Sequence, residues 1–239
     1  MARGIEDRDI FNDDEDRTTF LNLLQESLFL AGHRCYAWVC MSNHYHLLVR
    51  CSEQPLGIMM RRLNSKYARY FSKKYSRRGY LFQDRYKSIA TQDQNYVEEL
   101  VRYIHLNPVR AGICATIDDL DRYAWSGHAV IMGKKDAAFQ DVEPVLRRFG
   151  GSREQYRRYL EEGSRSETEK EFIVTIRRSN EGREDTLNVG SWVIGDPDFV
   201  RTVLATDRNR RIKVARYQKE GWDVSRLADV ISLQSYRTC

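Results

Sequence analysis

Two histidines separated by one residue could hold a divalent metal ion in this chain. They are His44 and His46, within the segment YAWVCMSNHYHLLVR of residues 36–50. This segment predicts two strands joined by a polar turn at residues 41–43. Because side chains alternate along a strand, both imidazoles lie on one face, about 7 Å apart, and Tyr45 lies on the other. Such a pair can chelate one metal ion, and a metal beside a nucleophile can break a phosphodiester. The alternative is two histidines on the solvated face of a half-buried strand.

A tyrosine and an asparagine one helical turn apart could supply a nucleophile and a further ligand. Tyr103 and Asn107 lie in residues 93–107, which predict a helix that Pro108 ends. Their i, i+4 spacing places both side chains on one stripe of that helix. The amide oxygen of asparagine suits hard ions such as Mg²⁺ and Mn²⁺. Ordinary amphipathic packing of Tyr103 and a helix stop at Asn107 are the alternative. His105 points elsewhere and is predicted to be structural.

The elements that must position these groups follow from hydrophobic periodicity. The sequence predicts a helix over 14–30, a strand pair over 34–51, a helix over 55–75, an extended segment over 80–89 and the helix over 93–107. The first two helices each have an apolar face, formed by Phe20, Leu21, Leu24 and Leu28 in one and by Met59, Leu63, Tyr67, Tyr70 and Phe71 in the other. The first 130 residues are therefore predicted to be α+β, with an antiparallel sheet and helices packed on it.

Charge is segregated along the chain more strongly than the formal net charge of +5 indicates. Residues 1–30 have a net charge of −5, whereas residues 61–87 contain ten basic residues and one acidic residue. A basic segment of this kind indicates a polyanionic partner. With aromatic side chains between the charges, it is typical of a single-stranded nucleic-acid groove. The predicted contacts are Arg61, Arg62, Lys66, Arg69, Lys73, Lys74, Arg77, Arg78, Arg85 and Lys87. The alternative is that the aromatic residues are core residues and only the charges face outward.

Composition argues against several other classes of protein. Charged residues form 31% of the chain, and no apolar run approaches the roughly 18 residues that span a bilayer. The acidic N-terminal region does not resemble a secretion signal, so a cytoplasmic location and no membrane partner are predicted. The five cysteines show no paired C-x-x-C spacing and are predicted to be reduced. Because Cys40 and Cys51 flank the histidines, a zinc site is a minor alternative.

The sequence changes in character after residue 132. Residues 133–190 predict a linker and an irregular or helical connecting region. Residues 191–239 predict a small, mainly helical module with helices over 196–204 and 208–232. Within it, residues 221–231 look like the first helix of a helix-turn-helix.

Several motifs occur together and in order. They are Ala2-Arg-Gly, Trp38-Val-Cys-Met-Ser-Asn-His-Tyr-His-Leu-Leu-Val49, Met60-Arg-Arg-Leu-Asn64, Tyr67-Ala-Arg-Tyr-Phe71, Leu81-Phe-Gln-Asp-Arg-Tyr-Lys87 and Tyr103-Ile-His-Leu-Asn-Pro-Val-Arg-Ala-Gly112. Over residues 2–130 this pattern closely resembles the REP-associated tyrosine transposases, relatives of the single-tyrosine HUH transposases. The resemblance implies a ferredoxin-like fold in which the sheet carries the histidines and a helix presents the tyrosine. It implies that His44 and His46 bind Mg²⁺ or Mn²⁺, that Asn107 is a third ligand, and that Tyr103 is the nucleophile.

The implied activity is a metal-dependent transesterase that nicks and rejoins hairpin-containing single-stranded DNA through a 5′-phosphotyrosine. The chain departs from the family at both ends, because the family has a strand before the Ala2-Arg-Gly segment and the tail ends before a recognition helix. Either the start of the chain is assigned too late or the first strand is missing, and a truncated or frameshifted gene would explain both ends. These departures favour the main alternative, a catalytically inactive, decayed or domesticated single-stranded nucleic-acid-binding protein. A replication initiator or relaxase of the same superfamily is a third possibility. The sequence leaves monomer and homodimer open.

Overall fold

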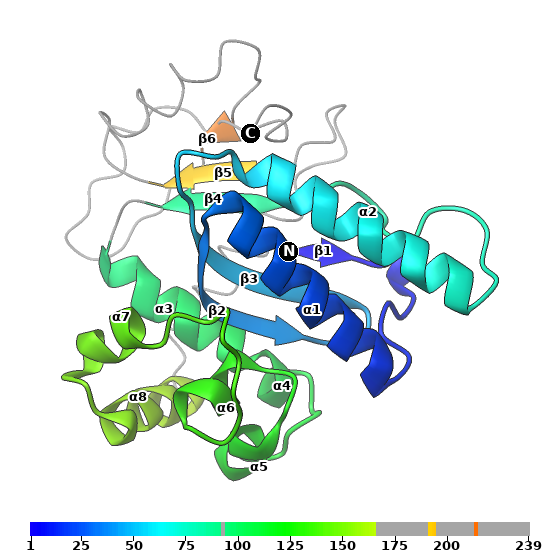
Figure 1. The fold of residues 1–239 in the computed structure, drawn as a ribbon. Helices are drawn as coiled ribbons and strands as arrows, with labels where there is room; N and C mark the ends of the chain where they lie inside the picture. The colour runs from blue at the N-terminus through cyan, green and yellow to red at the C-terminus, as the bar shows by residue number, and fades with distance from the viewer. Residues whose placement is uncertain (92–93, 166–190, 195–212, 215–239) are drawn as a thin grey trace.

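The computed structural model describes residues 1–91, 94–165, 191–194 and 213–214 (Figure 1). Its main sheet is antiparallel and contains β1 (Ala2–Arg3), β2 (Arg34–Cys40) and β3 (His44–Arg50) in the order β1-β3-β2. Helices cover both faces of this sheet, so the predicted α+β class is confirmed. Among the described residues, no helix is long and apolar enough to cross a membrane.

The predicted strand pair is a hairpin whose register fixes the faces of the histidines. Val39 pairs with His46 and Cys40 pairs with Tyr45, and the turn is closed by a hydrogen bond from Met41 N to His44 O of 2.9 Å. Tyr45 is fully buried in the core on one face of the sheet. His46 contacts the helix on the other face, as alternation along a strand predicts.

The short strand β1 has neighbours on both sides. It pairs with β3 through Ala2 and Arg3. On its other side, Gln83 N donates to Arg3 O at 3.0 Å and Lys87 N donates to Met1 O at 2.8 Å. The extended segment predicted over 80–89 therefore lies beside β1 and continues into β4 (Ser88–Thr91). The expectation that the sheet lacks its first strand stays a prediction.

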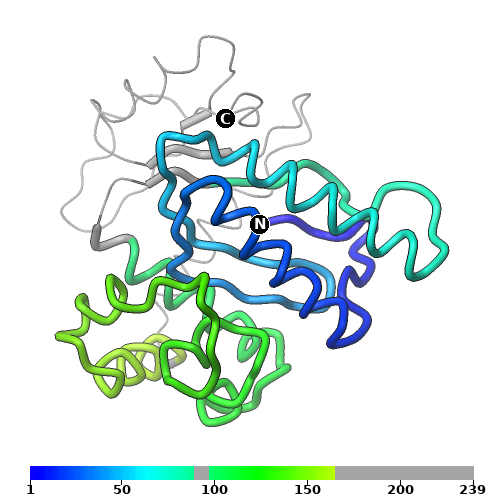
Figure 2. Tube along the Cα trace, in the orientation of Figure 1, coloured from blue at the N-terminus to red at the C-terminus, as the bar shows by residue number. Residues whose placement is uncertain are grey.

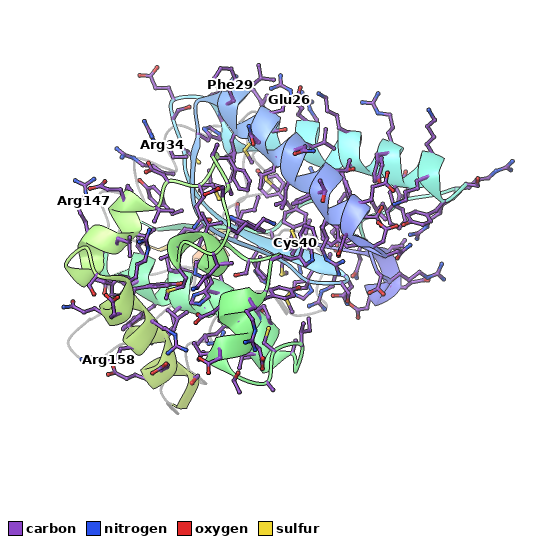
Figure 3. The ribbon with its side chains drawn as sticks, turned by 60° about the horizontal axis from the view of Figure 1, so that its bottom comes forward. Glu26, Phe29, Arg34, Cys40, Arg147 and Arg158 are labelled. Carbon is purple, nitrogen blue, oxygen red and sulfur yellow. The ribbon has the colours of Figure 1, made fainter. Side chains whose placement is uncertain are left out.

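Helices α1 (Asp14–Ala31) and α2 (Leu56–Lys74) pack on one face of the main sheet. The Asp13 side chain accepts a hydrogen bond from Asp16 N and caps α1, and Gly32 ends it with a φ of 66°. The core on this face contains the apolar residues predicted for both helices, including Phe20, Leu24, Met59, Leu63, Tyr67 and Phe71. Figure 3 labels Phe29 at the exposed end of α1 and Cys40 at the level of the sheet.

The opposite face is covered by α3 (Gln94–His105). A group of short helices that we call the helical lobe packs against α3 and along the edge of β2, where Cys40 N donates to Trp125 O and Asp141 N donates to Cys35 O. The lobe spans residues 107–165 and gathers on one side of the sheet in Figure 2. It contains α4 (Asn107–Arg110), α5 (Ile117–Arg122), α6 (Gly127–Ile131), α7 (Glu143–Leu146), the 3-10 turn η2 (Arg147–Phe149) and α8 (Arg153–Arg165). A second core joins it to the sheet through Ala37, Val39, Val101, Ile104, Ile131, Phe149, Tyr156 and Leu160.

The end of the tyrosine helix differs from the prediction. The sequence predicted one helix through Asn107 that Pro108 ends, whereas α3 ends at His105 and Asn107 begins α4. Proline fits in the first turn of a helix because its missing N–H has no helical partner there. Backbone hydrogen bonds of the α-helical i to i−4 type are present on both sides of the junction, from Leu106 N to Arg102 O and from Ala111 N to Asn107 O.

The predictions for the rest of the chain fall partly outside the described residues. Side chains from Ala137 to Leu160 pack in the two cores, and the proposed domain boundaries stay predictions. Strand β5 (Ser191–Ile194) pairs with β4, and β6 (Lys213–Val214) pairs with β5. The helix predicted over 208–232 is thus wrong at β6, because pairing with β5 outweighs local helical periodicity. The helix predicted over 196–204 and the helix-turn-helix segment over 221–231 lie outside the described residues.

Candidate active site

A cavity of about 620 Å³ lies where β1, β3, the α3–α4 junction and residues 83–87 meet. Its lining includes four of the predicted site residues, His44, His46, Tyr103 and Asn107. It also includes four basic residues, Arg3, Arg85, Lys87 and Arg110. Two acidic residues, Asp7 and Asp84, complete the charged lining. The structure therefore brings together the predicted metal ligands and the predicted nucleophile in a cavity with more basic than acidic side chains.

The imidazoles and the tyrosine ring are in direct proximity within one chain. The ring centroids of His44 and His46 are 5.1 Å apart, and those of His46 and Tyr103 are 5.6 Å apart with nearly perpendicular planes. His46 is only 8% exposed, whereas Tyr103 is half-buried at the cavity wall. The tyrosine helix thus places its phenol beside the histidine strand of the same molecule.

The tautomer of His44 follows from its neighbour Asn43. The Asn43 Nδ2 amide donates to Asp7 O at 3.1 Å, so Asn43 Oδ1 is the atom that lies 2.6 Å from His44 Nδ1. An amide oxygen can only accept, and therefore Nδ1 of His44 carries the proton. The lone pair of the neutral ring is then on Nε2, the nitrogen left to bind a metal.

The turn that holds Asn43 has an unusual backbone. Asp7 and its neighbour Glu6 have φ angles of 57° and 54°, in the left-handed region, within the 3-10 turn η1 (Ile5–Asp7). Residues other than glycine rarely adopt this backbone conformation. It turns the Asp7 carbonyl toward the Asn43 amide, and Gly4 N donates to Asn43 O at 2.8 Å.

Both histidines favour the neutral state. Burial lowers the pKa of His44 to about 4, with a contribution from the positive charge of Arg3. Burial also lowers the pKa of His46 well below its usual range, and the neighbouring His44 adds to this effect. Because a protonated imidazole cannot coordinate a metal, this environment keeps the pair competent as ligands at neutral pH.

Asn107 is oriented by the end of the helix that carries Tyr103. Its Nδ2 donates to Tyr103 O at 2.7 Å and more weakly to Ile104 O at 3.4 Å. Only the amide nitrogen can donate to a carbonyl, so the Asn107 oxygen is the atom available as a ligand. Arg110 Nη1 also donates to Tyr103 O at 2.9 Å, and its guanidinium lies 5.3 Å from the centre of the Tyr103 ring.

This donor set fits a hard or borderline divalent ion. Within the described residues, no three His, Cys, Asp or Glu side chains are grouped for metal binding. The candidate set is two imidazole nitrogens and one amide oxygen; the amide oxygen suits hard ions such as Mg²⁺ and Mn²⁺, and imidazole suits borderline ions. The zinc alternative finds no support at Cys40, which is buried in the core on the opposite face of the sheet, where burial raises its thiol pKa to about 12.

The ten predicted nucleic-acid contacts divide between two faces of the molecule. Arg85 and Lys87 line the cavity. Arg77 and Arg78 lie in the loop that follows α2. The other six lie on α2, which packs on the face opposite α3: Arg61, Arg62, Lys66, Arg69, Lys73 and Lys74.

Two of the basic side chains on α2 are engaged by carboxylates. Lys74 Nζ lies within 2.9 Å of oxygens of Asp13, Glu15 and Asp16 at the start of α1. Lys66 Nζ lies 2.6 Å from Glu26. These pairs join α1 to α2, so the segregated charges of the sequence partly neutralise each other in the fold.

Sequence reasoning missed three residues of the site: Arg3, Arg110 and Asn43. Arg110 could have been found from the sequence, because it follows Asn107 by three residues and so lies on the same helical stripe. The only sequence indication for Asn43 is its place in the turn next to His44. Arg3 had none, because its position depends on the pairing of β1 with β3.

Comparison with known proteins gave one match. Residues 2–107 match the family model described as Transposase IS200 like, and this range includes all four predicted site residues. Searches of curated proteins and of solved structures each found no match. The match covers less than half of the chain and supports, for that part, the IS200-like transposase family and a DNA-processing function.

Proposed function

Starting from an IS200-like transposase region over residues 2–107, we propose that the chain is a single-tyrosine DNA transesterase of the REP-associated type. It would nick and rejoin hairpin-containing single-stranded DNA through a 5′-phosphotyrosine. The observation that carries this proposal is the Tyr103 ring 5.6 Å from His46, in a cavity that Asn107 also lines.

We propose that His44, His46 and Asn107 hold Mg²⁺ or Mn²⁺. Support comes from the neutral imidazoles, from the Asn43 contact that leaves His44 Nε2 as the ligand atom, and from the orientation of the Asn107 amide. When bound, such an ion would offset the charge that develops on a phosphate in the transition state.

The chain's own residues account for the rest of the proposed chemistry. The Tyr103 oxygen attacks the phosphorus in line, forming the Tyr–O–P bond and breaking the bond to the 3′ oxygen. The phenol proton passes to water, and the departing 3′ oxygen takes up a proton. A second 3′-hydroxyl can reverse the step, because the phosphotyrosine retains the energy of the broken ester. Arg3, Arg85, Lys87 and Arg110 line the same cavity and would attract the phosphates of the strand.

The proposal is tested by incubating the full chain with single-stranded DNA that contains a hairpin, with Mn²⁺ or Mg²⁺. We expect an SDS-resistant protein–DNA adduct, and mass spectrometry should find the nucleotide on the peptide that contains Tyr103. Chelation with EDTA should prevent it. Salt-sensitive DNA binding without an adduct for any hairpin would instead support the catalytically inactive binding protein.

Replacing Asn43 with alanine is expected to weaken Mn²⁺ binding about 10- to 100-fold, the usual effect of losing a residue that orients a metal-binding histidine. The variant removes the acceptor that fixes the His44 tautomer. Isothermal titration calorimetry measures the affinity. Ser42→Ala is the matched control, because it alters the same turn and leaves the Asn43–His44 contact in place. Equal Mn²⁺ affinity in Asn43→Ala and Ser42→Ala would contradict the role of Asn43.

Replacing Arg85 with alanine is expected to reduce the slope of log Kobs against log salt for single-stranded DNA by about 0.7, the contribution of one phosphate contact. Arg85 lines the cavity, whereas the exposed Arg61 lies on α2 across the sheet. Arg61→Ala therefore serves as a comparison with the same change of charge. Fluorescence anisotropy at several salt concentrations gives both slopes. A larger reduction of the slope in Arg61→Ala would place the DNA on α2 instead of at the cavity.

A further inference from the structure

A chain of buried polar side chains lies behind the tyrosine helix, outside the candidate active site. It joins Asp121 on α5, His128 on α6, Tyr156 on α8 and His105 at the end of α3. His105, His128 and Tyr156 are each 0% exposed. We call these four residues the polar chain. Three of them lie beyond residue 107 and therefore outside the family match.

The direction of every hydrogen bond in the polar chain can be derived from its Asp121 end. Asp121 Oδ1 lies 2.6 Å from His128 Nε2, and a carboxylate only accepts, so Nε2 carries a proton. Burial lowers the pKa of His128, which makes it a neutral ring with an acceptor at Nδ1. The Tyr156 hydroxyl, 2.8 Å from that nitrogen, is then the donor.

The same reasoning continues to His105. A tyrosine hydroxyl has one proton, and here it is used toward His128. The Tyr156 oxygen must therefore accept from His105 Nδ1, which lies 2.7 Å away. His105 is assigned the tautomer protonated at Nδ1, with a lone pair at the buried Nε2, an atom with no hydrogen-bond partner in the structure.

The polar chain is anchored firmly at its outer end and packed closely at its inner end. Arg157 Nε lies 3.1 Å from Asp121 Oδ2 and also pairs with Asp118 and Glu161. At the other end, a Cβ built on Gly127 would lie 3.0 Å from His105 Nε2 and 2.7 Å from Gln140 Oε1. Little space is left for α3 to shift toward the lobe.

His105 and Tyr103 lie on opposite sides of α3, because two residues correspond to about 200° of helical rotation. Tyr103 faces His46 and the cavity, whereas His105 faces α8. Apolar contacts of Val101 and Ile104 also hold the helix, and the hydrogen bonds of the polar chain add a constraint on its direction. We propose that the polar chain is a positioning device, through which the helical lobe fixes the tyrosine helix relative to the histidine strand.

This inference rests on the proposed function only for its kinetic test. In Tyr156→Phe the ring remains packed 5.4 Å from Phe149, while the hydroxyl that joins His105 to His128 is lost. We expect the single-turnover rate of adduct formation at saturating DNA and Mn²⁺ to fall about 10- to 100-fold, because small misplacements of a reacting group have effects of this size. DNA and Mn²⁺ affinities should stay within about twofold.

The matched control is Tyr123→Phe, which loses a tyrosine hydroxyl bonded to Cys40 O at 2.9 Å in the same lobe but not on the polar chain. Both variants are compared at a temperature where circular dichroism shows them folded. A rate in Tyr156→Phe within twofold of the wild type, or an equal loss in Tyr123→Phe, would overturn the proposal.

Two further measurements do not depend on catalysis and separate this inference from the proposed function. Nitrogen-15 NMR of the histidine rings should show His105 protonated at Nδ1 in the wild type and not fixed in that form in Tyr156→Phe. Amide hydrogen exchange of α3 should accelerate relative to α1 in Tyr156→Phe. If the wild type forms no adduct, the proposed function fails while these results still support the polar chain. A wild-type His105 protonated at Nε2, or equal acceleration in α1 and α3, would overturn it.

Discussion

Replacing Tyr103 with phenylalanine is expected to reduce adduct formation to less than about one-thousandth of the wild-type rate, since losing a covalent nucleophile has effects of this order or larger. The substitution removes only the phenol oxygen. The ring can keep its contact with His46 at 5.6 Å and the Arg110 guanidinium 5.3 Å from its centre. The variant should therefore fold, bind Mn²⁺ and bind DNA like the wild type, while gels under denaturing conditions show no adduct.

A suitable control for this variant is Tyr36→Phe. Tyr36 is a partly buried tyrosine that packs in the core on the same face of the sheet as His46 and Tyr103. Its variant should form the adduct at the wild-type rate. Persistence of the adduct in Tyr103→Phe, with the nucleotide on another residue, would refute the assignment of the nucleophile.

Replacing His46 with alanine is expected to weaken Mn²⁺ binding at least about 100-fold and to abolish the adduct, because it removes one of two imidazole ligands. Calorimetry measures the affinity. His33→Ala is the control, since His33 is also a buried histidine but bonds to Ser52, away from the cavity. If His46→Ala and His33→Ala bound Mn²⁺ with the same affinity, the proposed ligand set would be contradicted.

The same measurement has a defined pH dependence in the wild type. Protons compete with the metal for each imidazole, so affinity is lost as the pH falls through the pKa of the metal-free folded site. Because the pKa of His44 is lowered to about 4, and that of His46 is also lowered, Mn²⁺ binding should hold between pH 7 and about pH 5. Loss of affinity already near pH 6.5, the ordinary range of histidine, would show that the rings are solvated.

The parts of the fold and site that the sequence predicted depend on local spacing. Alternation along β3 placed His46 and Tyr45 on opposite faces, and i, i+4 spacing placed Tyr103 and Asn107 together. The apolar stripes of α1 and α2 were equally readable. Each of these patterns is set by the period of a single element.

The parts that could not be predicted depend on how elements meet. Charge alone did not show that the basic residues of α2 lie across the sheet from the cavity, or that Lys74 is engaged by the start of α1. His105 was predicted to be structural, but its link to Asp121 passes through three helices of the lobe. No sequence spacing reports such contacts, because the partners are brought together only by tertiary packing.

The proximity of Tyr103 to His46 within one molecule also sets the stoichiometry of the proposed reaction. If the site were completed by a second subunit, dilution would separate the two subunits and reduce the number of DNA ends that the protein can capture. Here each chain contains its own nucleophile and its own proposed ligands. The number of DNA ends that a preparation can capture should therefore equal the number of its chains, whatever their concentration.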